Sequence, residues 1–266
     1  KLASRFIDGF DDPGKAKVFV NKSMGLTFAE KTIDTDESDW KKLIHLPRFD
    51  GDTLVYSCEE VPAEVQFLTA GQDSRETQLH WNVWGWGNVR DVDGNLRFCT
   101  WLINAGIVAR EKSPILNEVD LKPLDGFLYD RSFEKVEGAQ LWVRQGMHDS
   151  GWQPNGVYDY CRNRKGISYP CKGASKKYGA SDKDHESNAE FISWRSLPEY
   201  VSRGAKIREK NVKLALINTY TLKKLWYGMS ERRFEDALGF ERSIITLPSD
   251  TPSDFLKQMA SEKLVK

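Results

Sequence analysis

The sequence lacks the motifs of several common protein classes. Its 266 residues contain four cysteines and no CxxC pair, so a disulfide framework is not indicated and the thiols are expected to be reduced, as in a cytosolic protein. No GxxxxGK[ST] phosphate-binding loop occurs, which excludes a nucleotide-hydrolysing site of that kind from this chain. No apolar run approaches the roughly 20 residues of a membrane span, and the first residues do not resemble a secretory signal. We therefore expect no membrane partner.

Net charge is also lacking, because 39 Lys and Arg balance 39 Asp and Glu. Any nucleic-acid surface must therefore come from local clustering of basic residues. An apolar content of 39% with nine Trp predicts a substantial core. Residues 1–60 are polar and turn-rich and are predicted to be a lead-in or linker packed on a main domain of residues 61–266. The chain begins without Met, so we expect it to be part of a longer protein.

The stretch 65–87, VQFLTAGQDSRETQLHWNVWGWG, predicts a β-hairpin. Its second half alternates, with Leu79, Trp81 and Val83 on one side and His80 and Trp84 among the residues on the other, which is typical of a strand. A short polar turn separates it from the first apolar run. That run ends at Asp73, so backbone would hold this carboxylate rigidly enough for a metal ion. The alternative is an ordinary turn aspartate.

A second carboxylate, Asp149, follows the predicted strand Leu141–Met147. Pro154 then opens a predicted helix over Val157–Arg164. A strand, a terminal aspartate, a tight turn and a helix place the carboxylate at the carboxyl edge of a sheet, where α/β proteins commonly bind ligands. Two carboxylates on neighbouring strands can hold two metal ions about 4 Å apart for phosphodiester hydrolysis. The alternative is a residue that only starts the helix.

The remaining pattern predicts an α/β fold. Strands are expected at Leu96–Val108, after an Asp91–Asn95 turn, and at Leu54–Tyr56, Val212–Ile217 and Ser243–Leu247. Helices are expected at Leu116–Phe133, interrupted by Pro123, at Tyr220–Leu238 and at Asp254–Lys263, which Ser253 caps.

A basic run with no acidic residue extends from Arg162 to Ala180. Its members are Arg162, Arg164, Lys165, Lys172, Lys176 and Lys177. Such a run favours phosphate binding, although like-charge blocks are often only solvated loops. Lys223 and Lys224 lie in the first turns of a predicted helix, where a nearby phosphate would offset the unfavourable helix dipole. The polar stretch Ser181–Asn188 is predicted to be a loop rather than a metal site.

Several segments together resemble a known family. FVNKSMG, LTAGQD, VWGWG, DSG with VYDYCR, CKGA and NTYTLKKLW occur in the order of the C-terminal nuclease part of lambda-type (GpA family) phage terminase large subunits. The similarity covers about 18–264. It implies an RNase H-like mixed sheet flanked by helices, and an endonuclease that cuts concatemeric viral DNA with two Mg²⁺ or Mn²⁺ ions. It also implies a missing N-terminal ATPase domain, double-stranded DNA, the terminase small subunit and the portal ring as partners, and action in the host cell cytoplasm.

The resemblance makes Asp73 and Asp149 metal ligands and places Lys172 near the scissile phosphate. Lys172 and the other basic residues of the run would hold the DNA strand, together with Lys223. One position departs from the family pattern, because Tyr220 stands where an Asp is expected. Asn218 is then a candidate ligand, and Asp159 or Asp236 could take the missing place if the fold brings them close.

This departure keeps a second interpretation open: a DNA- or portal-binding module in which the nuclease site has decayed. A weaker alternative is a recombination or transposition nuclease of the same fold. Metal-dependent nicking of plasmid DNA distinguishes an enzyme from a binding module.

Overall fold

The computed structural model describes residues 32–33, 36–44, 56–111, 113, 115–173, 192–261 and 264–265. The predicted strand residues Leu54 and Val55, the loop 181–188, and Lys176 and Lys177 lie outside this part. In the described residues, no helix is both long and apolar enough to cross a bilayer.

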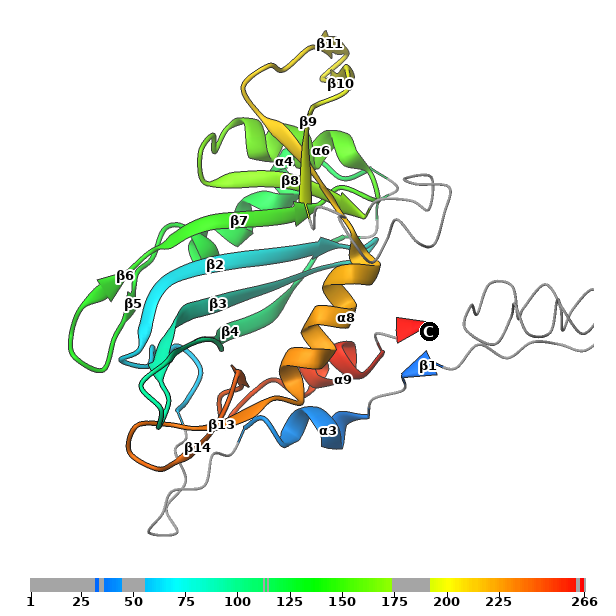
Figure 1. The fold of residues 1–266 in the computed structure, drawn as a ribbon. Coiled ribbons are helices and arrows are strands. Elements are labelled where there is room, and N and C mark those ends of the chain that lie inside the picture. Colours follow the sequence, from blue (N-terminus) through cyan, green and yellow to red (C-terminus); the bar gives the residue numbers. More distant parts are fainter. Residues whose placement is uncertain are drawn as a thin grey trace, which may run out of the picture.

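One mixed sheet of eight strands organises the chain (Figure 1). In spatial order the strands are β15 (Ile245–Thr246), β4 (Leu96–Ala109), β3 (Gln78–Arg90), β2 (Val65–Ser74), β7 (Val143–Asp149), β8 (Ser168–Gly173), β12 (Lys213–Ile217) and β9 (Ile192–Ser196). The consecutive strands β2, β3 and β4 are antiparallel. The next strands, β7, β8 and β12, each run parallel to β2. The expected mixed α/β sheet is confirmed.

The alternation in β3 decides which residues each face of the sheet buries. Leu79, Trp81 and Val83 join one core cluster, whereas Trp84 joins the other. This is the division that the sequence pattern predicts. The turn at Asp91–Asn95 is confirmed as well, with Gly94 at a φ of 83°, and the hairpin between β2 and β3 places Asp73 next to the end of its strand.

Helices cover both faces (Figure 1). One face packs on α4 (Glu118–Leu121), the 3₁₀ helix η2 (Lys122–Leu124), α5 (Asp125–Leu128) and α6 (Pro154–Arg162). The other packs on α3 (Glu37–Lys41), α8 (Thr219–Ser230) and α9 (Ser253–Ser261). Trp84 meets Trp226 of α8 edge to face, with ring centroids 5.0 Å apart, a geometry worth about 0.5–1.5 kcal/mol beyond burial. Trp40 of α3 is buried in this second core, so part of the predicted lead-in packs on the main domain.

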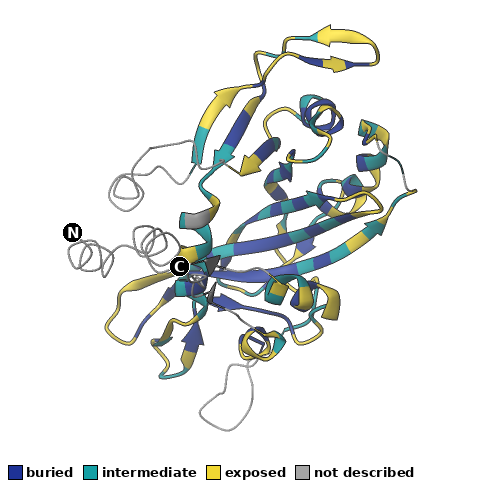
Figure 2. Ribbon diagram, turned by 90° about the vertical axis from the view of Figure 1, so that its right-hand side faces the viewer, coloured by how far each residue is buried: buried dark blue, intermediate teal, exposed yellow. Residues whose placement is uncertain are grey.

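Short two-stranded elements lie outside the main sheet, whose central strands contain many buried residues (Figure 2). They are β5 (Phe133–Glu134) with β6 (Gln140–Leu141), β10 (Tyr200–Ser202) with β11 (Ala205–Ile207), β13 (Arg233–Glu235) with β14 (Glu241–Ser243), and β1 (Thr32–Ile33) with β16 (Leu264–Val265).

One predicted helix is shorter than expected. The helix expected to reach Leu238 ends at Ser230, because Asp236 accepts backbone N–H groups from Leu238 and Phe240 and closes a turn instead. Gly239 takes a φ of 84° in that turn. The basic run spans more than one element, and its residues 168–173 form β8 inside the sheet. The helix interruption at Pro123 is confirmed: Pro123 lies in η2, between α4 and α5.

Candidate active site

The carboxyl ends of four parallel strands meet at one edge of the sheet. Gln72 of β2 pairs with His148 of β7, so the residues that follow, Asp73 and Asp149, are neighbours on adjacent strands. Parallel strands that share an edge commonly form a ligand site there. The two predicted carboxylates are therefore brought together at one edge, which we call the acid edge.

Asp73 faces an arginine on the same hairpin. Arg75 Nε lies 3.0 Å from Asp73 Oδ2, and both side chains are partly solvent-exposed. His80 of β3 pairs with Asp73 across the antiparallel ladder. Burial and the charge of Arg75 lower the pKa of His80, while Asp73 opposes this shift. Asp73 is thus part of a small charged cluster rather than an isolated turn residue.

Asp149 is more enclosed. The backbone N–H of Gly151 donates to Asp149 Oδ1 at 3.0 Å. Burial raises the pKa of Asp149, and the negative charge of Asp73 adds to the rise, whereas Lys172 lowers it. Two neighbouring carboxylates repel each other when both are ionised. Their oxygen atoms therefore suit a divalent cation, which neutralises both charges. The residues present therefore fit a metal ion held by these two side chains.

Two further predicted residues lie near the carboxyl ends of β8 and β12. Lys172 is exposed and pairs with Leu216 of β12. Because Asp149 pairs with Cys171, strand alternation turns Lys172 toward the opposite face. Asn218 follows β12 and caps α8, where its Oδ1 accepts the N–H of Thr221 at 3.1 Å. The oxygen proposed as a metal ligand thus already has a structural partner.

A buried hydrogen-bond chain runs directly behind the acid edge. The Tyr129 hydroxyl lies 2.9 Å from His148 Nε2, and His148 Nδ1 lies 3.3 Å from Gln72 Oε1. Gln72 Nε2 then donates to Ser74 Oγ at 2.7 Å. Burial lowers the pKa of His148 to about 3, so the imidazole is neutral. This chain links the two strands that carry Asp73 and Asp149, immediately beside both residues.

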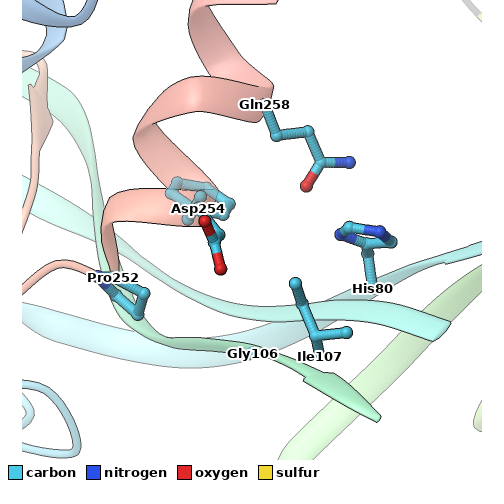
Figure 3. A pocket seen from close by; sticks show the side chains of 7 residues that line it. His80, Gly106, Ile107, Pro252, Asp254 and Gln258 are labelled. Carbon is cyan, nitrogen blue, oxygen red and sulfur yellow. The ribbon is translucent and has the colours of Figure 1, made fainter. Parts of the chain in front are cut away.

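A cavity of about 150 Å³ lies next to this edge. In Figure 3 the ring of His80, on β3, lies below Gln258 of α9, with Asp254 on the same helix. The other lining residues are Gly106, Ile107, Pro252 and Phe255. His80 Nε2 is buried and has no hydrogen-bond partner among the described residues.

The structure separates the members of the basic run. Arg164 is not a surface cation: it is mostly buried, pairs with Asp125 through Nε at 2.6 Å, and stacks on Tyr160. Arg162 lies 3.2 Å from Asp159. Lys165 is exposed and lies 3.6 Å from Glu209. Lys223 lies on α8.

The proposed substitute acids are engaged elsewhere. Tyr200 and Ser202 donate to Asp159 on α6, and Arg242 Nε lies 2.7 Å from Asp236. Tyr220 lies in the first turn of α8. In the part of the chain that the structure describes, no group of three or more His, Cys, Asp or Glu side chains is arranged around a common metal position.

Sequence reasoning missed Arg75 and the chain through Tyr129, His148 and Gln72. Arg75 had a visible signal, because it lies two residues after Asp73 and alternation favours the same side of the strand. His148 and Gln72 were visible only as neighbours of the two acids. Tyr129 had no signal, since its contact depends on how α5 packs.

Comparisons of the sequence with a family model and with known proteins point to the same family. A family model described as "Terminase large subunit gpA, endonuclease domain" matches residues 1–266. The terminase large subunit of Escherichia phage lambda is 27% identical over 168 residues, covering 62% of this chain and 23% of that protein. The terminase large subunit of Enterobacteria phage P21 is 36% identical over 173 residues, covering 64% and 24%. The chain thus spans about a quarter of the length of these relatives. No solved structure matches it.

Proposed function

Because the chain belongs to the terminase large subunit gpA endonuclease family, we propose that it is the metal-dependent endonuclease that cuts concatemeric viral DNA during genome packaging. One observation carries this proposal: Asp73 and Asp149 lie at the same ends of neighbouring parallel strands. Paired carboxylates at such an edge are the ligands that two-metal phosphodiester hydrolysis requires.

The fold we propose is RNase H-like. Three sequential antiparallel strands are followed by a helical segment, a parallel strand, a helix and another parallel strand. This order of elements supports the likeness.

Each residue at the acid edge has a proposed role. Asp73 and Asp149 hold two divalent ions, Mg²⁺ or Mn²⁺, which when bound would lower the pKa of a water and neutralise charge on the phosphate. Lys172 starts on the opposite face of β8, but its charge still lowers the pKa of Asp149, and we propose that its side chain holds a DNA phosphate, which gives position without sequence information. Two carboxylates supply little ligand charge, so we expect weak Mg²⁺ binding and a preference for Mn²⁺. To bind a metal ion, Asn218 would have to use the same amide oxygen that caps α8.

The DNA surface and the partners are also proposals. Arg162, Lys165 and Lys223, with Lys176 and Lys177 outside the described residues, would contact backbone phosphates of double-stranded DNA. The buried ion pair of Arg164 removes it from this set. The terminase small subunit, the portal ring and an ATPase domain of the same polypeptide are the expected protein partners, in the host cell cytoplasm.

Plasmid nicking tests this function directly. The wild-type protein should nick supercoiled plasmid with Mn²⁺ and stop in EDTA, whereas Asp73→Asn should abolish nicking without loss of folding. Asp93→Asn is the matched control, because Asp93 is an exposed aspartate in the turn between β3 and β4. If Asp73→Asn cuts at the wild-type rate, the active site lies elsewhere. Salt-sensitive DNA binding without cleavage would instead indicate a binding module.

A further inference from the structure

Asp73 has a cation beside it before any metal ion binds. Arg75 Nε lies 3.0 Å from Asp73 Oδ2. A divalent cation that uses this carboxylate must share it with the guanidinium or displace it. The two side chains are 55% and 37% exposed, and ion pairs this exposed are weak enough to exchange readily.

Hydrogen bonds fix the backbone around Arg75, whereas its side chain is half-exposed. Arg75 N–H donates to Gln78 O at 2.9 Å and closes the tip of the hairpin. Arg110, whose side chain is only 4% exposed, donates to Glu76 O at 2.6 Å and to Ile115 O at 2.9 Å. These bonds anchor the tip to the loop that precedes α4. A change of rotamer is therefore sufficient to move the guanidinium away from the acid edge.

We propose that Arg75 exchanges partners during substrate binding: it neutralises Asp73 in the metal-free protein and moves to a phosphate of the DNA strand when a divalent cation occupies that carboxylate. A guanidinium suits both partners, because its planar fork matches carboxylate and phosphate oxygens. Arg75 is thus a DNA-positioning residue that also controls metal loading. This inference rests on the metal and DNA binding that the proposed function assigns to the acid edge.

The exchange makes metal and DNA binding cooperative. DNA that draws Arg75 away from Asp73 frees the carboxylate for the cation, and the cation releases Arg75 for DNA. Thermodynamic linkage requires the two effects to be equal in size. A metal-free acid edge would then bind DNA poorly, and a DNA-free acid edge would bind metal poorly.

The first test measures Mn²⁺ binding without DNA, from the EPR signal of free Mn²⁺. Arg75→Ala should bind Mn²⁺ about two- to five-fold tighter than wild type, the range expected for loss of an exposed competing ion pair. Arg75→Lys keeps the charge and should change less. Arg208→Ala is the matched control, since Arg208 is an exposed arginine 3.5 Å from Glu199, and it should match wild type. Unchanged or weaker Mn²⁺ binding by Arg75→Ala would overturn the proposal.

The second test measures binding to a fluorescent DNA duplex across salt concentrations, in EDTA and in Ca²⁺, a cation that also takes oxygen ligands. The salt slope of wild type should be steeper in Ca²⁺ by about one unit, because Arg75 gains one phosphate. Arg75→Ala should lose this increment and match wild type in EDTA. A wild-type increment that survives in Arg75→Ala contradicts the exchange.

The two proposals fail separately. If Mn²⁺ binding depends on Asp73 and on Arg75 as described but plasmid is not cut, the nuclease function is wrong and the exchange stands. If plasmid is cut while both tests leave Arg75→Ala like wild type, only the exchange is wrong.

Discussion

Removing the Tyr129 hydroxyl should weaken the buried hydrogen-bond chain that supports the acid edge. Tyr129 ends α5, and its hydroxyl meets His148 Nε2 at 2.9 Å. The Nδ1 atom of the neutral imidazole faces the side-chain oxygen Oε1 of Gln72 at 3.3 Å, so Nδ1 carries the proton. Nε2 therefore accepts the bond from the Tyr129 hydroxyl. A Cβ at position 146 would overlap the Tyr129 hydroxyl, so Gly146 leaves the space that the bond needs. Tyr129→Phe removes one hydroxyl and keeps the ring.

The size of the effect follows from what the variant leaves behind. His148 is fully buried, so its Nε2 would lose its partner without gaining water. An unsatisfied buried acceptor costs about 1–3 kcal/mol. At about 2–4 °C per kcal/mol for a chain of this size, the melting temperature should fall by roughly 2–12 °C. Affinity for Mn²⁺ should fall as well, since His148, which bonds Gln72 across the two strands that carry Asp73 and Asp149, loses the contact that orients its ring.

Urea unfolding followed by tryptophan fluorescence measures the stability change. Tyr169→Phe is the matched control, because among the described residues the Tyr169 hydroxyl makes a long surface contact of 3.4 Å to Gly166 O, and its loss should cost less than about 0.5 kcal/mol. If Tyr129→Phe is as stable as this control, the hydrogen-bond chain does not support the acid edge.

Three other variants test the charge of Asp149, the ion pair of Arg164 and the space beside Asp149. In EDTA at pH 7, Asp149→Asn should be more stable than wild type, because burial and Asp73 raise the pKa of the native carboxyl. Wild type gains stability as the pH falls from that raised pKa toward the ordinary value, so the difference in urea midpoints should close there, and a widening difference refutes it. Arg164→Ala should cost about 3 kcal/mol, because Asp125 loses its cation and keeps the Tyr160 hydroxyl as a donor, with an unchanged salt slope for duplex binding. Gly151→Ala should fold normally yet weaken Mn²⁺ binding, because its Cβ would lie 3.3 Å from both Asp149 oxygens.

Local sequence patterns predict much of the fold. The hairpin of β2 and β3 and the division of its side chains between two faces follow from period-two alternation and a short polar turn, which need only neighbouring residues. For the same reason, Asp73 and Asp149 could be placed near strand ends from sequence. That these strands are adjacent is a property of the sheet order, and it came from the family resemblance rather than from spacing.

The interior strand β8 could not be predicted, for a physical reason. Its sequence, SYPCKG, contains Pro170, which pairs in register with His148. Proline offers no N–H to a ladder and normally argues against a central strand. The sequence therefore places Lys172 only in the basic run, although it lies near the end of a strand inside the sheet.

Predictions from local sequence fail most clearly for the partners of charged residues. Arg164 belongs to a run of like charges, yet its partner Asp125 is 39 residues away and holds it in a partly buried ion pair. Arg75, only two residues from Asp73, could have been linked to that acid from sequence alone. The difference lies in the distance over which an ion pair is specified: strand alternation brings together i and i+2, whereas a helix packed on a sheet brings together residues that no local pattern connects. The electrostatics of the acid edge thus follow from sequence only where the hairpin itself supplies the partner.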